Sequence, residues 1–317
     1  ELPFTLNDEY ISFATGVEYR REEGAETPDA FRQAGISRRL QVFATEGSFY
    51  SYEAFGEMFL PVYDWLNVSL ALRVGDYSSI GNTSTYRLGI DSPINDYVRF
   101  RASVSSAVRA PNVNDLFAAG SASATGGHDV CDGVDASTAG NVAANCRSID
   151  AIADRIAADG SFTLVGSESQ NERLLTTGSE SLKEEKADTY TIGAVFTPME
   201  SLSVSVDYYS IEIEDAILNV GAGDIINRCY NVDPSEFDAT CGGSVVRAVN
   251  GPILNITSKA INESEVKTSG VDLEVFYTMD KLDLSLSASY LDEYVTTSKA
   301  GVERDYKGEV LYPKFRY

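Results

Sequence analysis

The segment Asp96–Arg109, DYVRFRASVSSAVR, alternates apolar and polar residues with a period of two. One face of this segment carries Val98, Phe100, Ala102, Val104 and Val108. The other face carries Tyr97, Arg99, Arg101, Ser103, Ser105 and Arg109. Because successive side chains of a β-strand point to opposite faces, the pattern predicts a strand with one apolar and one polar side.

The same alternation recurs along the chain and predicts about ten strands. Their expected ranges are 8–22, 47–63, 66–79, 83–93, 96–109, 186–198, 201–215, 260–279, 281–296 and 304–317. Several exceed the roughly 5–6 residues that are usual in globular sheets. They match the roughly 9–11 tilted residues with which a strand crosses a bilayer.

The connections between these segments alternate between short and long. Tight turns are expected at 64–65, 93–95, 198–200 and 279–281, and longer loops at 23–46, 110–185, 216–259 and 297–303, with a shorter one near 80–82. If consecutive strands are antiparallel neighbours, all tight turns lie at one rim and all long loops at the other. The sequence therefore predicts an all-β fold, an antiparallel up-and-down transmembrane β-barrel with long extracellular loops.

Composition narrows the function classes. The 317 residues include 48 Asp plus Glu against 25 Lys plus Arg, a net charge of −23, with a single His. Phosphate backbones would repel such a chain, so no nucleic-acid partner is expected. One histidine and the absence of Cys-x-x-Cys spacing give little material for a catalytic triad or a zinc site. We therefore expect no enzyme, no catalytic residue, no cofactor and no metal.

A soluble β-sandwich is the alternative to a barrel, because it also alternates but buries its apolar face. In the barrel, the polar face encloses water, and the lumen-facing candidates are Arg99, Arg101, Arg109, Asp207, Asp272 and Glu274. The arginines would either attract anionic solutes or pair with carboxylates of neighbouring strands. Both possibilities stay open at this point.

The four cysteines form two local pairs, Cys131 with Cys146 and Cys229 with Cys241, each inside one long loop. Four cysteines allow three connectivities, but local pairing keeps each bridge on one side of the barrel. Such bridges indicate an oxidising compartment. In the first of these loops, His128 is expected to be solvated.

The segment 148–156 lies in the same loop. Its Ile149, Ile152 and Ile156 recur at helical spacing behind a possible Ser148 cap, which predicts a short surface helix.

Two segments are similar to motifs of a known family. They are residues 99–117, RFRASVSSAVRAPNVNDLF, and residues 181–193, SLKEEKADTYTIG. They resemble the Arg-Ala-Pro strand end and the Leu-Lys-Pro-Glu…Tyr…Gly strand of TonB-dependent outer-membrane receptors, with Glu184 standing where proline is usual. Segments 9–21, 202–217 and 266–274 resemble further strands in family order.

The resemblance implies a multi-pass outer-membrane receptor for TonB-energised uptake of a scarce bulky solute, such as a siderophore–iron complex, a saccharide or cobalamin. Its partners would be outer-membrane lipid and lipopolysaccharide, the extracellular solute, and the TonB complex through a missing N-terminal segment. Such transporters have 22 strands and a plug. Residues 1–317 are therefore expected to be part of a receptor β-barrel domain. The alternatives are a passive porin or adhesin barrel and a secreted all-β binding protein.

Overall fold

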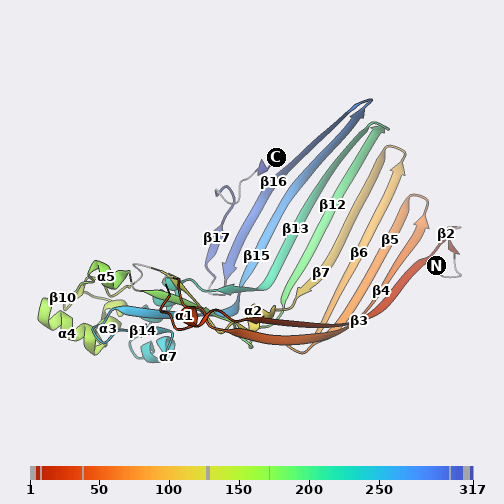
Figure 1. The fold of residues 1–317 in the computed structure, drawn as a ribbon. Helices are drawn as coiled ribbons and strands as arrows, with labels where there is room; N and C mark the ends of the chain where they lie inside the picture. Colours follow the sequence, from red (N-terminus) through yellow and green to blue (C-terminus); the bar gives the residue numbers. More distant parts are fainter. Residues whose placement is uncertain are drawn as a thin grey trace.

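The computed structural model describes residues 5–7, 9–37, 39–125, 129–170, 172–299, 301–309 and 315–316. Its main feature is one large antiparallel sheet whose strands are neighbours in space in chain order (Figure 1). The strands are β3 (Ser12–Glu26), β4 (Thr45–Tyr63), β5 (Leu66–Tyr77), β6 (Gly81–Asn95), β7 (Val98–Arg109), β12 (Glu185–Met199), β13 (Leu202–Asn219), β15 (Ile253–Met279), β16 (Leu282–Ser298) and β17 (Glu303–Asp305). The predicted all-β, antiparallel fold is confirmed.

The two rims of the sheet differ as the connections predict. Hairpin turns lie at one rim, and short helices gather beyond the other (Figure 1). One predicted turn is wrong, because β6 continues through Pro93 to Asn95 and the turn falls at Asp96–Tyr97. The Asn95 side-chain oxygen accepts hydrogen bonds there from the backbone N–H groups of Tyr97 and Val98, at 2.9 and 3.0 Å. A short polar side chain thus fixes the turn.

The register separates apolar from polar rows. One row crosses the sheet through Phe100, Ala194, Val206, Leu273 and Ala288. The adjacent row, one residue away on each strand, is Arg101, Gly193, Asp207, Asp272 and Ser289. Neighbouring rows point to opposite faces, so the sheet has one apolar and one polar face.

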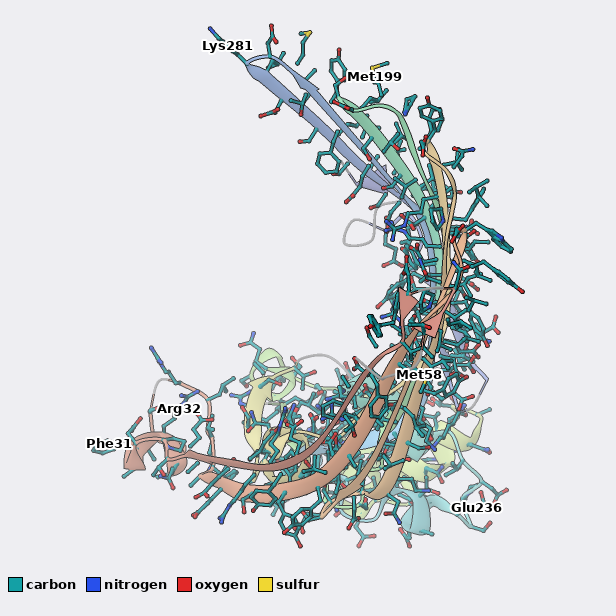
Figure 2. The ribbon with its side chains drawn as sticks, turned by 90° about the vertical axis from the view of Figure 1, so that its right-hand side faces the viewer. Phe31, Arg32, Met58, Met199, Glu236 and Lys281 are labelled. Carbon is teal, nitrogen blue, oxygen red and sulfur yellow. A yellow bond between two sulfur atoms is a disulfide. The ribbon has the colours of Figure 1, made fainter. Side chains whose placement is uncertain are left out.

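The apolar face is not a dry core. Phe100 is 48% exposed and Leu284 is 52% exposed, and Val98 and Val204 are only half-buried. A sandwich would bury these side chains between two sheets. The sheet instead curves like a section of a barrel wall (Figure 2). None of the described helices has the length and hydropathy to cross a membrane.

The remaining elements belong mainly to the two longest connections. Between β7 and β12 lie α2 (Val113–Phe117), β8 (Ser121–Ala124), β9 (Val134–Asp135), α3 (Asn141–Arg147), α4 (Asp150–Asp159), β10 (Ser161–Phe162), α5 (Gly166–Ser169) and β11 (Arg173–Thr177). Between β13 and β15 lie α6 (Ala222–Tyr230), α7 (Phe237–Cys241) and β14 (Val245–Arg247). The shorter elements elsewhere are β1 (Thr5–Leu6), β2 (Glu9–Tyr10), α1 (Ala30–Gln33) and β18 (Phe315–Arg316).

The predicted helix at 148–156 corresponds to α4, which has exposed residues at the surface as expected, but the predicted Ser148 cap is wrong. Ser148 ends α3, and Ile149 precedes α4 without a side-chain cap. Ile152 is fully buried and Ile156 is nearly so. The isoleucine stripe packs into a core because a second loop covers it.

Gly270 allows two neighbouring strands to approach closely. A Cβ at this position would lie 2.5 Å from the backbone oxygen of Tyr290 and 2.6 Å from the hydroxyl of Tyr209. We expect Gly270→Ala to destabilise the sheet by about 1–3 kcal/mol through overpacking. The heat-modified mobility shift of the full-length protein on a gel would then occur at a lower temperature.

Gly166→Ala is the matched control, because a Cβ there meets nothing within 4 Å. Equal transition temperatures for the two variants would contradict the close approach at Gly270.

Candidate functional site

The polar face of the sheet carries ion pairs that reach across strands. Arg101 of β7 donates two hydrogen bonds to the carboxylate of Asp207 of β13, at 2.8 and 2.5 Å. The strand between them, β12, places Gly193 opposite both residues. A Cβ on Gly193 would collide with the Asp207 carboxylate, so the glycine makes room for this pair.

Arg109, at the end of β7, connects the sheet to the long loop that follows through hydrogen bonds. Its guanidinium donates two hydrogen bonds to Glu185 at 2.6 and 2.7 Å and one to Asp115 at 3.0 Å. Asp115 also completes the capping box of α2 with Asn112. The bidentate geometry fixes the start of the loop over the polar face.

All six lumen-facing candidates share this face. Arg99 pairs with Asp91 at 2.8 Å, and the register places Asp272 beside Asp207 and Glu274 beside Ser205. The structure thus brings the arginines to neighbouring carboxylates, one of the two possibilities left open by the sequence. That this face borders a lumen stays a prediction.

A second charged network was not foreseen from the sequence. The guanidinium of Arg73 on β5 pairs with Glu18 of β3 at 2.6 Å and with the carboxylate of Glu53 on β4. The Tyr77 hydroxyl donates a hydrogen bond to Glu53 at 2.8 Å. Alternation identifies the shared face of these residues, but the pairing requires the register of three strands.

Beyond the rim, the loops 110–185 and 216–259 fold together into one unit, here called the loop module. Its hydrophobic core takes Cys131, Cys146, Ile152, Ile156 and Phe162 from the first loop and Ala222, Ile226, Cys229, Tyr230, Ile253 and Ile256 from the second. Neither loop builds this core alone. The two connections are therefore one packed structure.

Both expected cysteine pairs are present in the loop module. Cys131 and Cys146 are bonded with their Cα atoms 5.6 Å apart, and Cys229 and Cys241 with theirs 4.9 Å apart. Both separations lie in the range that a disulfide spans. Three of the four cysteines are buried in the shared core.

A buried ion pair joins the two loops. Arg247 and Asp129, which are 118 residues apart, pair at 2.7 Å with side-chain exposures of 8% and 2%. Every guanidinium donor is used. Besides Asp129, the acceptors are the Tyr230 hydroxyl at 2.7 Å, the Gly251 carbonyl at 2.8 Å and the Cys131 Sγ at 3.2 Å. A buried charge is tolerable only when it is satisfied in this way.

The protonation states follow from this contact. Burial on its own lowers the pKa of the Arg247 guanidinium, but the hydrogen bonds and the charge of Asp129 outweigh burial, and the pKa is raised. Burial raises the pKa of the Tyr230 hydroxyl, which stays a neutral acceptor for Arg247. The Arg247 guanidinium therefore remains charged through the neutral range.

Backbone contacts complete the union of the loops. β11 runs parallel to the start of β15 and antiparallel to β8, and β14 pairs with β15 on the other side. The third long connection joins through Val42, which bridges to Ser121. The buried Asn145 side chain donates to the carbonyls of Tyr230 and Val232, each at 2.9 Å. None of these pairings has a sequence signal, because each joins distant segments.

Metal-binding and catalytic groups are sparse. Within the described ranges, no group of three or more His, Cys, Asp and Glu residues could hold a metal ion. Glu184 and Glu185 are engaged by Lys186 and Arg109. His128 lies outside the described residues. The main features of the described residues are instead the ion-paired polar face and the packed loop module.

Arg247→Gln should unfold the loop module locally, because it leaves Asp129 buried and unpaired, at a cost of about 3–5 kcal/mol. Hydrogen exchange of the full-length protein would show faster exchange in 129–164 and 225–256 together. Arg304→Gln is the control, since it breaks the exposed 3.6 Å pair with Glu309 and a contact with the Tyr306 ring, both outside the loop module. Faster exchange confined to one loop would contradict the shared core.

Asp135 gives the loop module an acid-sensitive turn. Hydrogen bonds from the side chains and backbone N–H groups of Ser137 and Thr138 lower its pKa from 3.8 to about 2. A lowered pKa stabilises the folded turn above pH 3.8, and the contribution disappears as the pH falls to about 2. Exchange protection at 135–138 should decline over this window in the native protein. Asp135→Asn should abolish that decline, and an unchanged profile would refute the role of the carboxylate.

A known protein family matches a region of the chain that includes the whole sheet. The family described as TonB dependent receptor-like, beta-barrel matches residues 1–316. Among curated proteins, no sequence relative matches the chain.

Solved structures with a similar fold include the siderophore receptor PirA from Acinetobacter baumannii, with a TM-score of 0.54, 16% identity, 91% of this chain covered and 36% of that chain. PirA from Pseudomonas aeruginosa has a TM-score of 0.52, 14% identity and coverage of 91% and 41%. A mutant ferric enterobactin receptor PfeA from Pseudomonas aeruginosa, in complex with enterobactin, has a TM-score of 0.58, 13% identity and coverage of 94% and 38%.

The chain thus spans about two fifths of the length of these receptors, and at such low identity the likeness concerns the fold. The matched residues 1–316 include every strand of the two-faced sheet described above. The chain belongs to the TonB-dependent receptor-like β-barrel family.

Proposed function

We propose that this chain is part of the barrel of a bacterial outer-membrane receptor that captures a scarce bulky solute and imports it with energy from TonB. The candidate solutes are siderophore–iron complexes, saccharides and cobalamin. The protein acts as a receptor and transporter and carries out no chemical reaction on the solute.

One observation carries this proposal: the curved sheet has an exposed apolar face on one side and a polar face with ion pairs on the other. In lipid, the backbone groups of a sheet must be paired internally, and the side chains that face the lipid must be apolar. We assign the apolar face to the membrane and lipopolysaccharide, and the polar face to a water-filled lumen. Residues 23–46, 110–185 and 216–259 then lie outside the cell.

The loop module supports a role in capture. The loop module lies beyond the rim of the sheet that carries the long connections. Two disulfides and the Arg247–Asp129 pair hold its shape. A pre-formed binding surface loses less conformational entropy when it binds a ligand. The disulfides suit an oxidising compartment outside the inner membrane.

The test uses the full-length protein in a strain that lacks its gene. Growth and uptake are measured on a panel of iron chelates, glycans and cobalamin, with and without a protonophore. We expect one solute class to require the receptor, and the protonophore to stop accumulation while leaving surface binding intact, because capture precedes the energised step.

Accumulation that persists with the protonophore would indicate a passive porin. Solubility of the folded protein without detergent would indicate a secreted binding protein. Either result would refute the proposal.

A further inference from the structure

The arginines of the polar face are almost all neutralised. The register places six arginines on this face of β3–β16, namely Arg20, Arg73, Arg87, Arg99, Arg101 and Arg109. The lysines of these strands that pair with Glu184, Glu212 and Glu265 lie on the opposite face. The charge that a solute meets at this wall therefore depends on the six arginines and their partners.

Five of the six arginines hold a carboxylate. Arg99 is 2.8 Å from Asp91, Arg101 is 2.5 Å from Asp207, and Arg109 is 2.6 Å from Glu185. Arg20 and Arg73 share Glu18, at 2.8 and 2.6 Å. An anion could bind one of these guanidinium groups only by displacing the carboxylate that already accepts hydrogen bonds from its N–H groups.

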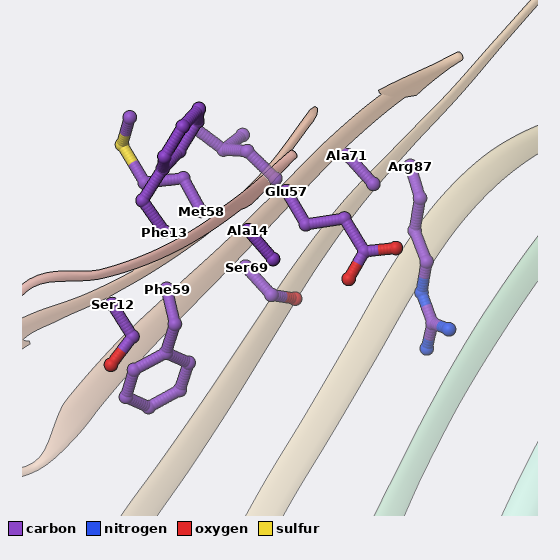
Figure 3. A pocket seen from close by; sticks show the side chains of 10 residues that line it. Ser12, Phe13, Ala14, Glu57, Met58, Phe59, Ser69, Ala71 and Arg87 are labelled. Carbon is purple, nitrogen blue, oxygen red and sulfur yellow. The ribbon is translucent and has the colours of Figure 1, made fainter. Parts of the chain in front are cut away.

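Among the residues that the structure describes, no carboxylate forms an ion pair with Arg87, although an acid lies next to it in the same row. Ala71 of β5 separates Arg87 from Glu57 in the same row, beside a shallow hollow of about 450 Å³. Figure 3 shows Glu57 and Arg87 on the same side of the sheet, opposite Phe13 and Met58. The row as a whole carries no net charge.

Carboxylates also remain without a basic partner. Within the described part of the chain, Asp272 and Glu274 on β15 form no ion pair, although both lie on the polar face near Arg101 and Asp207. The polar face is therefore neutral along β3–β7 and acidic toward β15.

We propose that the solute handled at this wall is neutral or cationic and that polyanionic solutes are excluded. A wall whose arginines are offset by carboxylates and whose surplus charges are carboxylates has a negative potential, which raises the local concentration of cations and lowers that of anions. This inference rests on the proposed function, because it takes the polar face as the lumen.

The first experiment measures ion selectivity independently of the solute. Full-length receptor is placed in planar bilayers with a KCl gradient and opened with mild urea, and the reversal potential gives the permeability ratio of K⁺ to Cl⁻. We expect a ratio above one for the native protein. Asp272→Asn with Glu274→Gln should lower the ratio by about twofold, because two lumen charges are lost.

The matched control removes two carboxylates from the opposite face of the same sheet. Asp188→Asn with Glu214→Gln changes the net charge equally, and neither residue forms an ion pair within the described ranges. The control should leave the permeability ratio unchanged. Anion selectivity of the native protein would overturn the inference. If the control lowers the ratio and the β15 variant does not, the assignment of faces in the proposed function is wrong as well.

The second experiment varies the charge of one chelate. A linear ferric trihydroxamate with a free terminal amine is monocationic, its N-acetyl derivative is neutral, and its N-succinyl derivative is anionic. Uptake by cells with the full-length receptor should favour the cationic and neutral forms at least severalfold. Preference for the anionic form would overturn the inference. If cells accumulate none of the three, the reversal potential alone decides the inference, and only the hydroxamate branch of the proposed function is lost.

Discussion

The hydrogen-bonded register of the antiparallel sheet determines which side chains can meet in this chain. A shift of one residue on any strand would exchange its two faces. Arg101 would then lie on the apolar face, and its contact with Asp207 across Gly193 would be lost. The ion pairs therefore depend on the register, and they reinforce it because each one joins strands that the backbone ladder has already aligned.

The two faces of the sheet place different demands on the side chains of the same strands. An apolar side chain on the apolar face needs no specific partner, and Phe100 and Leu284 are exposed there. A charged side chain on the polar face interacts with its neighbours at short range, and Arg101 reaches Asp207 because the small residue Gly193 lies between them. The glycine thus makes room for the two charges.

The sequence predicts the strands and faces better than the loops. Alternation from Asp96 to Arg109 locates β7 and its polar face because its period is local. The turn at Asn95 was misplaced because Pro93 is tolerated within β6, where the register is irregular. Arg247 and Asp129 were not foreseen because no local pattern links residues in separate loops. The burial of Ile152 was missed for the same reason, since it belongs to a core to which both long loops contribute.

β15 joins the two parts of the molecule through one continuous backbone. Residues 255–259 pair with β11 in the loop module, and residues from 260 onward pair with β13 in the wall. At a rise of about 3.3 Å per residue, this extended strand reaches from the loop module into the wall without interruption. The loop module cannot shift along β15 without breaking hydrogen bonds in one of the two sheets. The hydrogen bonds of β15 therefore set the position of the loop module relative to the wall, and they also orient the charges of the wall.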